Sequence, residues 1–435
     1  MPSASPAPLR VAIVGGGVGG LCTAVGLLNE AKRTGCEVEV TIFEQASKFG
    51  EIGAGVSMGL NAVKALRMIG AGEALQKAAK ERDPKLETWF DFHIAQRDHK
   101  TPGAYICTIE SGKEGEGNMN VHRADLLDEL VALLPPSIAQ FRKRCKSYTN
   151  TPSGTVRIDF EDGTAAEADV LIAADGIKSL IRRQIWENKD FPEETQRATY
   201  SKWVAWRGLI PVETYEAVMG KERAKKIMHL GKGAHILTFP VRGGTLVNLV
   251  AFVQDNEEKK LEGRTGPWSE ERPKEEMLED FAGFTDECLA LLKAIPRCSV
   301  WGIWAIPAID TISDGNVLLI GDAAHSMTPH QGAGAGQATE DALFISRLLT
   351  APAVAHVSDR PKAIRRALEA YEKARHQHSL DVQRTSRECG LLYEFCGVNG
   401  EGDDVEKLKA SLEYRLRWIW DYDLEKAAEE AVQSL

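Results

Sequence analysis

The strongest constraint on the fold of this chain is a glycine pattern near its start, in the stretch LRVAIVGGGVGG over residues 9–20. Gly15, Gly17 and Gly20 follow the G-x-G-x-x-G spacing. The apolar run before them, Val11–Val14, is typical of a buried parallel strand, and the apolar residues after them recur at helical spacing. The sequence therefore predicts a strand, a glycine turn and a helix in succession.

Each glycine of this turn has a physical reason. The first allows a tight turn, the second lets the backbone approach a pyrophosphate, and the third lets the helix pack closely on the strand. The start of the helix carries unpaired N–H groups and the positive end of the helix dipole. A second predicted strand, residues 38–43, ends at Glu44, where the motif expects a carboxylate for a ribose hydroxyl. These features predict a dinucleotide site.

Two later segments also combine a buried strand with small residues. The strand in ADVLIAADG ends at Asp175, which places a carboxylate at the sheet edge where open α/β sheets bind ligands. The strand predicted at 317–320 ends just before Asp322, and a glycine-rich loop at 332–336 then opens a helix. So many small residues indicate a close approach of the backbone to a ligand.

Arg123 stands directly before a leucine-rich helix. A cation at the N-terminal end of a helix is unfavourable for the helix dipole, so the helix itself supplies no reason for this residue. The position favours a role in binding an anion, with a plain surface charge as the alternative.

Residues 203–252 contain segments rich in aromatic and β-branched residues, which predict a mostly antiparallel sheet. Arg207 lies inside one of these segments, between Trp206 and Gly208, where a charge must reach a partner or be costly. An aromatic-lined surface with one arginine suits an aromatic acid or a phenolate. A structural salt bridge is the alternative, and the sequence alone leaves both open.

Composition excludes several classes of protein. The net charge of −10 argues against a nucleic-acid surface, and no apolar run reaches the roughly 18 residues that a membrane span needs. Eight cysteines without a C-x-x-C pair are typical of reduced thiols in a cytoplasmic protein. His376 and His378 do not share a helix face, so we expect no metal site. The amphipathic helical segment 361–435 indicates packing on the domain or on a second subunit of a homodimer.

Together these segments resemble the FAD-dependent aromatic hydroxylases, a family of single-component flavoprotein monooxygenases. GGGVGG with Glu44 matches the ADP-binding motif of the family, and AADG at 173–176 matches its Asp-Gly motif. GDAAH at 321–325, followed by PHQGAGAGQ, matches its Gly-Asp motif. The resemblance covers nearly the whole chain, and the three motifs in this order are specific.

The resemblance implies an α/β fold with a Rossmann-type FAD-binding domain. We expect this domain in two parts, residues 9–200 and 301–360, the second carrying the Gly-Asp motif. A mostly antiparallel β-sheet domain for the substrate is inserted between them at 201–300, and a helical segment, 361–435, follows.

The resemblance also implies residues that bind the cofactor. Glu44 would bind the adenosine ribose, Arg123 would contact the FAD, and Asp322 would bind its ribityl or pyrophosphate region. Asp175 is associated in the family with both FAD and the nicotinamide donor. The other residues implied along the cofactor, the last three of them beside the flavin ring, are Gly55, Val56, Gly332, Gly334 and Ala335.

The reaction of the family needs two co-substrates besides the small aromatic substrate. Hydride from NADH or NADPH reduces the FAD, O2 adds to form a flavin C4a-hydroperoxide, and the substrate ring attacks its distal oxygen. This chain has no second G-x-G-x-x-G, which agrees with a family that lacks a separate domain for the nicotinamide donor.

Within the family, EIGAGV at 51–56 and GAHILTFPV at 233–241 most resemble fungal salicylate hydroxylase-like enzymes. Related fungal enzymes that dearomatise phenols bind the phenolate with an arginine before a glycine and with a tyrosine before a proline. Here Arg207 matches the arginine, but Phe239 stands in place of the tyrosine. The departure favours a salicylate-like reaction, in which attack at the carboxyl-bearing carbon releases CO2 and gives catechol.

For this reaction we expect Arg207 to bind the carboxylate or phenolate, and His235 and His330 to influence the phenol proton. Two other functions stay open. One is a biosynthetic monooxygenase that epoxidises or hydroxylates a polyketide or terpenoid, and the other is a flavin-binding protein without turnover.

Overall fold

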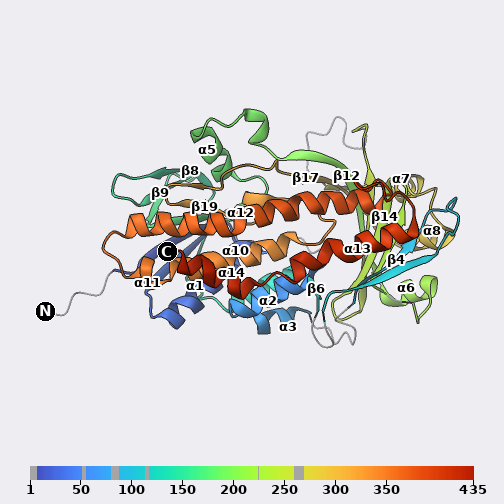
Figure 1. Ribbon diagram of the computed structural model, residues 1–435, viewed down its shortest axis with the longest axis horizontal. Helices are drawn as coiled ribbons and strands as arrows, with labels where there is room; N and C mark the ends of the chain where they lie inside the picture. The colour runs from blue at the N-terminus through green and yellow to red at the C-terminus, as the bar shows by residue number, and fades with distance from the viewer. Residues whose placement is uncertain (1–6, 51–54, 80–87, 113–116, 224, 259–268) are drawn as a thin grey trace.

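The computed structural model describes residues 7–50, 55–79, 88–112, 117–223, 225–258 and 269–435. Two large sheets lie towards opposite ends of the molecule, and the long helix α12, Arg360–Tyr393, runs from one to the other (Figure 1). The predicted α/β fold class is confirmed, with a nucleotide-binding sheet, a second sheet and C-terminal helices.

The first sheet has six strands in the order β18-β19-β11-β1-β2-β7, and β19, β11, β1, β2 and β7 run parallel. Its central strands are short apolar runs because helices and loops cover both faces. The carboxyl ends of these parallel strands therefore meet at one edge. The strands are β1 (Leu9–Val14), β2 (Val38–Glu44), β7 (Ala139–Phe141), β11 (Val170–Ala173), β18 (Ser313–Asp314) and β19 (Val317–Leu319).

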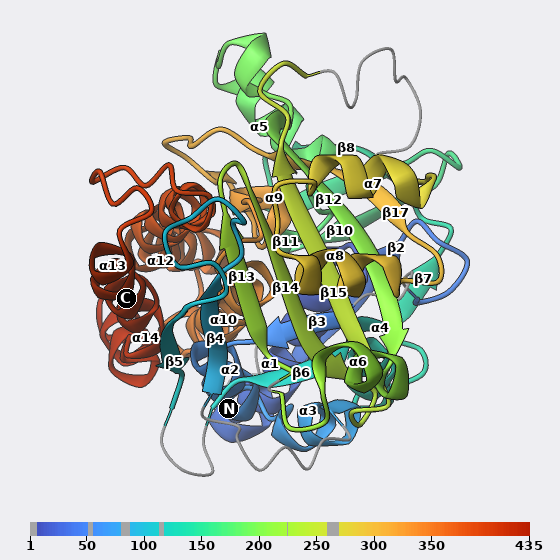
Figure 2. The same ribbon diagram turned by 90° about the vertical axis from the view of Figure 1, so that its right-hand side faces the viewer.

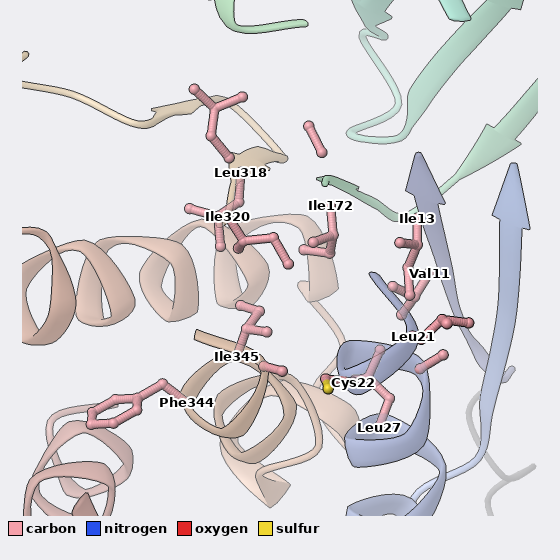
Figure 3. Close-up of a cluster of buried hydrophobic side chains, with 14 of the residues drawn as sticks. Val11, Ile13, Leu21, Cys22, Leu27, Ile172, Leu318, Ile320, Phe344 and Ile345 are labelled. Atoms are coloured by element: carbon pink, nitrogen blue, oxygen red, sulfur yellow. The ribbon is translucent and has the colours of Figure 1, made fainter. Parts of the chain in front are cut away.

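Two helices, α1 (Val18–Thr34) and α10 (Gly334–Leu349), pack against each other beside this sheet. Apolar side chains of both helices and of β1, β11 and β19 fill the space between them (Figure 3). Gly26 allows the close approach, because a Cβ there would lie 2.5 Å from the Ser346 hydroxyl oxygen. This packing fixes where each helix begins relative to the sheet edge.

The second sheet has eight strands in the order β16-β17-β12-β15-β14-β13-β4-β5 and is mostly antiparallel (Figure 2). Its strands are β4 (Thr88–Ile94), β5 (Tyr105–Glu110), β12 (Thr199–Pro211), β13 (Ile227–Gly231), β14 (Ala234–Val241), β15 (Leu246–Gln254), β16 (Ser269–Glu271) and β17 (Ser299–Ala305). Three short helices lie on the face that Figure 2 turns to the viewer: α6 (Val212–Met219), α7 (Lys274–Asp280) and α8 (Asp286–Lys293).

This sheet draws on more of the chain than the range 201–300 predicted for the substrate domain. Strands β4 and β5 come from residues 88–110, and β4 pairs in parallel with β13. Because β4 and β13 are so distant in the chain, their pairing leaves no local signal in the sequence. Between β12 and β13 the chain forms a short helix, Val212–Met219.

Two smaller sheets complete the strand structure. Residues 156–173 form three strands, and the chain passes from one sheet to another at Asp169, whose carboxylate accepts hydrogen bonds from Arg10. The remaining strands are β3 (Gly55–Met58) with β6 (Met119–His122), and β8 (Cys145–Asn150), β9 (Val156–Phe160) and β10 (Ala165–Ala168). The remaining helices of this half are α2 (Leu60–Met68), α3 (Gly72–Ala79), α4 (Arg123–Ala132), α5 (Leu180–Asn188), α9 (Asp322–His325) and α11 (Pro352–Ala355).

The C-terminal segment is helical, as predicted. Helix α12 is 34 residues long, and α13 (Val405–Trp420) and α14 (Leu424–Gln433) pack back along it. Glu394, directly after α12, is fully buried against the second sheet. No helix in the described part of the chain is long and apolar enough to cross a membrane.

Candidate active site

The glycine turn after β1 has a backbone that larger residues would not tolerate. Gly15 has φ of +107°, and a Cβ there would lie 2.3 Å from the Ala174 carbonyl oxygen. A Cβ on Gly20 would lie 2.0 Å from the Gly15 oxygen, so Gly20 lets α1 start close to β1. Gly15 and Gly17 line a cavity at the sheet edge, whereas Gly20 supports the turn from behind.

Glu44, at the end of β2, is held by two backbone N–H groups. Its Oε2 accepts a hydrogen bond from the Gly16 nitrogen at 2.7 Å, and its Oε1 accepts one from the Ala46 nitrogen at 2.7 Å. The side chain lies in the cavity wall, and each carboxylate oxygen can accept further hydrogen bonds. This geometry suits ribose hydroxyls.

The cavity along this edge has a volume of about 660 Å³, and both α1 and α10 begin at it. Their N-cap residues, Gly17 and Ala333, supply no side-chain hydrogen bond to the helix. A Cβ added to Gly17, Gly176 or Gly334 would meet no atom within 4 Å, so the backbone is open to the cavity there. N–H groups at two helix starts can therefore approach a diphosphate, as binding of FAD requires.

Asp175 and Asp322 follow β11 and β19 and both line the cavity. The Asp175 Oδ2 accepts a hydrogen bond from the Leu180 nitrogen at 3.0 Å, which ties it to the first turn of α5. Its Oδ1 is buried without a hydrogen-bond partner among the described residues, and burial raises the pKa of this carboxyl. Asp322 is exposed at the start of α9. A buried acceptor without a partner at the wall fits a ligand that brings donors.

The turn before Asp322 is held in place by Asp341, a residue that the sequence analysis missed. Gly321 has φ of +58°, and its N–H donates to Asp341 Oδ2 at 2.9 Å. His325 Nε2 lies 2.6 Å from the same oxygen, and Arg375 Nε donates to Oδ1 at 3.2 Å. Burial opposes the charge, but His325 and Arg375 hold the pKa of Asp341 well below its usual range. The sequence did offer one signal for Asp341, because an acidic residue is unusual in a largely apolar helix.

Gly55, Val56 and Arg123 also lie in the cavity wall. Gly55 is on β3, and a Cβ there would lie 2.9 Å from the Phe239 ring on β14, so this glycine allows the two sheets to approach each other. Arg123 begins α4 directly after β6. Residues 51–54 of the EIGAGV motif lie outside the described residues.

Gly332, Gly334 and Ala335 line the cavity at the start of α10, where the resemblance places the flavin ring. Gly332 has φ of +62°, and a Cβ there would lie 3.2 Å from the Trp89 ring. The loop thus presents backbone to the cavity on the side of the second sheet.

The second sheet walls the other part of the cavity. Register places Arg207, Val250 and Leu237 side by side on β12, β15 and β14. The other sheet residues in this wall are mostly apolar or aromatic: Trp89, Phe90, Met228, Phe239, Asn248 and Phe252. A wall of this kind suits a planar aromatic ring. Trp89 and Phe90 come from β4, whose place in this sheet the sequence did not show.

Arg207 is the cation of this wall. Its guanidinium lies over the Trp301 ring, 5.1 Å from the ring centre, and its Nε has no hydrogen-bond partner among the described residues. Burial, together with the charge of Arg123, lowers the pKa of Arg207 to about 10, and no carboxylate in the described part of the chain counters that shift. A structural salt bridge is therefore the weaker of the two interpretations.

The two candidate histidines occupy different positions. His330 lines the cavity and packs against Trp203 and Phe252, with ring centres 5.1 and 4.9 Å apart. His235 does not line the cavity; it stacks on Phe252, and its Nδ1 lies 2.9 Å from Glu394 Oε1. His330 thus lies in the cavity wall, whereas His235 lies behind it and contacts the wall through Phe252.

Four basic residues of the cavity wall were not singled out from the sequence: Lys48, Lys143, Arg144 and Lys178. Lys143 is engaged with Asp162, at 2.7 Å. Basic side chains near the nucleotide motifs attract phosphate groups. They lie in segments that follow different strands and share no motif, so their convergence depends on the fold.

Comparison with known proteins identifies the family of this chain. Residues 8–386 match the FAD binding domain family. Salicylate hydroxylase of Pseudomonas putida is 40% identical over 434 residues, covering 97% of this chain and 94% of that protein. The 6-methylsalicylate 1-monooxygenase of Aspergillus terreus is 35% identical and covers 98% of this chain and 92% of that protein.

A solved salicylate hydroxylase substrate complex has the same fold, with a TM-score of 0.85 and 36% identity over 98% of this chain and 99% of that chain. The crystal structure of CtdE in complex with FAD and substrate 4 is 20% identical over 98% of each chain, with a TM-score of 0.77, and shows the fold alone. The chain therefore belongs to the FAD binding domain family and is an FAD-dependent monooxygenase related to the salicylate hydroxylases.

Proposed function

We propose that this enzyme hydroxylates a salicylate-like phenolic acid with NADH or NADPH and O2, releasing CO2 and giving a catechol. The observation that carries the proposal is Arg207, a half-buried cation without a carboxylate partner among the described residues, in an aromatic wall beside the nucleotide site. Arg207 can bind a planar carboxylate through two N–H groups. The names of the relatives, salicylate hydroxylase and 6-methylsalicylate 1-monooxygenase, support this substrate class.

Bound FAD supplies the redox chemistry with the nicotinamide donor and O2, and the protein supplies binding and orientation. Glu44 would hold the adenosine ribose, and the open helix starts at Gly17 and Gly334 would receive the diphosphate. Asp322 would bind the ribityl or pyrophosphate region, and Asp175 would contact FAD and the donor.

The substrate part of the proposal follows from the wall of the second sheet. Arg207 would hold the carboxylate while the aromatic side chains keep the ring in one plane and exclude water. Oxygen transfer to the ring is electrophilic, so a group that accepts the phenol proton speeds it. His330 lies in the wall with both ring nitrogens unpaired among the described residues, and we assign that role to it.

The cellular location and the oligomeric state of the enzyme remain predictions. The eight cysteines carry free thiols, which supports a cytoplasmic location. The prediction of a homodimer rests on the amphipathic C-terminal helices alone.

The test is oxidation of NADH and NADPH by the FAD-loaded protein, with and without salicylate or 6-methylsalicylate, with products identified by mass. Stimulated oxidation with release of CO2 and a catechol supports the proposal. Slow, unstimulated oxidation that yields hydrogen peroxide overturns the salicylate assignment and favours a larger polyketide or terpenoid substrate. Absence of oxidation with any aromatic ligand would indicate a flavin-binding protein without turnover.

A further inference from the structure

A group of unpaired buried polar atoms begins at His330 in the cavity wall and continues behind the wall at His235. Both ring nitrogens of His330 and the Nε2 of His235 have no hydrogen-bond partner among the described residues, although both side chains are buried. Buried polar atoms are normally satisfied, so three such atoms in two neighbouring rings call for an explanation. The ring centres are 5.3 Å apart, a separation at which rotation of one ring brings nitrogens of the two rings towards each other.

The second nitrogen of His235 leads away from the cavity to a carboxyl group. His235 Nδ1 lies 2.9 Å from Glu394 Oε1, and both side chains are fully buried. Glu394 follows the last residue of α12, so the long helix carries it to the second sheet. A cavity histidine, a second histidine and a carboxyl group thus form a row.

The other neighbours of Glu394 are neutral. Trp203 on β12 and Gln254 on β15 donate hydrogen bonds to its Oε2 at 2.8 and 2.7 Å. Arg387 on α12 lies over the Trp203 ring, 4.9 Å from its centre, and donates to the Ser201 carbonyl oxygen rather than to the carboxyl. Within the described part of the chain, Glu394 has no ion partner other than His235.

We propose that Glu394 is the terminal proton acceptor of a buried relay, His330–His235–Glu394, that removes the hydroxyl proton of the substrate from the cavity. The inference rests on the proposed function, because it assumes a phenolic substrate beside His330. It adds a residue that does not touch the substrate and acts through the two histidines.

The transfers balance without any further reactant. The substrate proton moves to one nitrogen of His330, and the proton on the other nitrogen of His330 moves to His235 Nε2. The proton on His235 Nδ1 then moves to Glu394 Oε1. One O–H bond breaks at the substrate and one forms at Glu394, both imidazoles remain neutral, and the reverse transfers return the proton after turnover.

The proton affinities of the three groups fit these roles. Burial raises the pKa of Glu394 to about 8, whereas burial lowers the pKa of His235 to about 3 and that of His330 well below its ordinary value. The two rings therefore stay neutral and pass protons on, while the carboxylate retains one. A carboxylate with a pKa near 8 is also a stronger base towards a phenol than an ordinary glutamate.

The test compares the FAD-loaded parent enzyme with Glu394→Gln, Glu394→Asp and, as a matched control, Glu388→Gln. Glu388 is on the same helix but pairs with Arg384 and Arg415 outside the cavity wall. Three quantities are measured from pH 6 to 9.5: kcat and KM with salicylate, and the absorbance of bound 5-nitrosalicylate, whose phenolate has its own visible band. His235→Gln, which breaks the relay with the carboxyl in place, serves if Glu394→Gln does not fold.

In the parent enzyme we expect kcat to rise with pH through about 8, as Glu394 ionises. In Glu394→Gln this rise is lost and kcat falls about 100-fold, the lower end of the range for general acid–base catalysis, while KM changes less than about threefold. The bound nitrophenol ionises at a pH at least one unit higher. Glu394→Asp regains part of kcat, and Glu388→Gln matches the parent.

A parent enzyme that turns over salicylate, with Glu394→Gln or His235→Gln matching it in kcat and in the ionisation of the bound probe, would overturn the relay and leave the proposed function standing. A parent enzyme that neither turns over salicylate nor binds the nitrosalicylate refutes the proposed function and the relay with it.

Discussion

Replacement of Arg207 by methionine separates its two interpretations, because they predict opposite effects on stability. The pKa of Arg207, lowered from 12.5 to about 10, corresponds to at most roughly 3 kcal/mol by which folding disfavours the charged side chain when no substrate is bound. Contact with the Trp301 ring returns about 0.5–2 kcal/mol of this. Arg207→Met should therefore leave the free energy of unfolding of the substrate-free enzyme unchanged or raise it.

Binding should respond in the opposite direction. A hydrogen bond to a charged group contributes about 1.5–3 kcal/mol, so loss of the guanidinium should weaken salicylate binding roughly 10- to 150-fold, with FAD retained. Arg207→Lys keeps the charge but loses the planar pair of donors, and should fall between the parent and Arg207→Met.

The assay is thermal unfolding with and without salicylate, together with KM. At a ligand concentration 100 times the Kd, binding adds about 2.7 kcal/mol to the stability of the parent, and most of this gain should vanish in Arg207→Met. A lower unfolding midpoint for substrate-free Arg207→Met, combined with an unchanged KM, would refute the reasoning and make Arg207 a structural residue.

Three further predictions concern the cofactor site and pH. Asp322→Ala should lose FAD during gel filtration while its far-UV circular dichroism is kept, and a fully yellow variant would contradict the role of Asp322. Gly20→Ala should lower stability by about 1–3 kcal/mol and weaken FAD retention, because its Cβ would lie 2.0 Å from a backbone oxygen. Gly19→Ala, whose Cβ would lie 3.5 Å from the nearest side-chain atom, is the control that should behave like the parent in the same melts. The pKa of Glu394, raised from 4.5 to about 8, means that the folded state binds more protons than the unfolded state, so stability falls as pH rises; the lowered pKa of His235 opposes this only up to about 6.5. From pH 6.5 to 8 the parent should lose about 1.5–2 kcal/mol more than Glu394→Gln in denaturant titrations.

The nucleotide-binding half could be predicted from the sequence because its signals are local. A strand, a glycine turn and a helix occur within about 25 consecutive residues around Gly15, and Glu44 and Asp175 each end a predicted strand. Parallel strands place these ends at one edge, so motifs distant in the chain converge without further information. The protein class and the FAD cofactor could therefore be predicted from the motifs of this half.

The substrate half was predicted less completely because it depends on pairing. Trp89 and Phe90 reach the cavity only because β4 joins β13 in parallel, and no sequence pattern states which strand will be its neighbour. The sequence does not distinguish the positions of His235 and His330. The path of the loop before α10 places His330 in the cavity wall, and the register of β14 places His235 behind it. The sequence showed which side chains were available for the site, but it did not show which of them would be neighbours in space.

Helix α12 links the two halves more closely than its predicted role as a packing surface implies. Near its middle, Arg375 bonds to Asp341, which accepts the hydrogen bond of the turn before Asp322. Just beyond its last residue, Glu394 bonds to His235 behind the substrate wall. The helix is 34 residues long and packed along its length, so the spacing between these two attachments is fixed. The cofactor turn and the substrate wall are therefore held in register by one rigid element, which explains why buried charged residues occur in a segment that the sequence presents as an ordinary amphipathic helix.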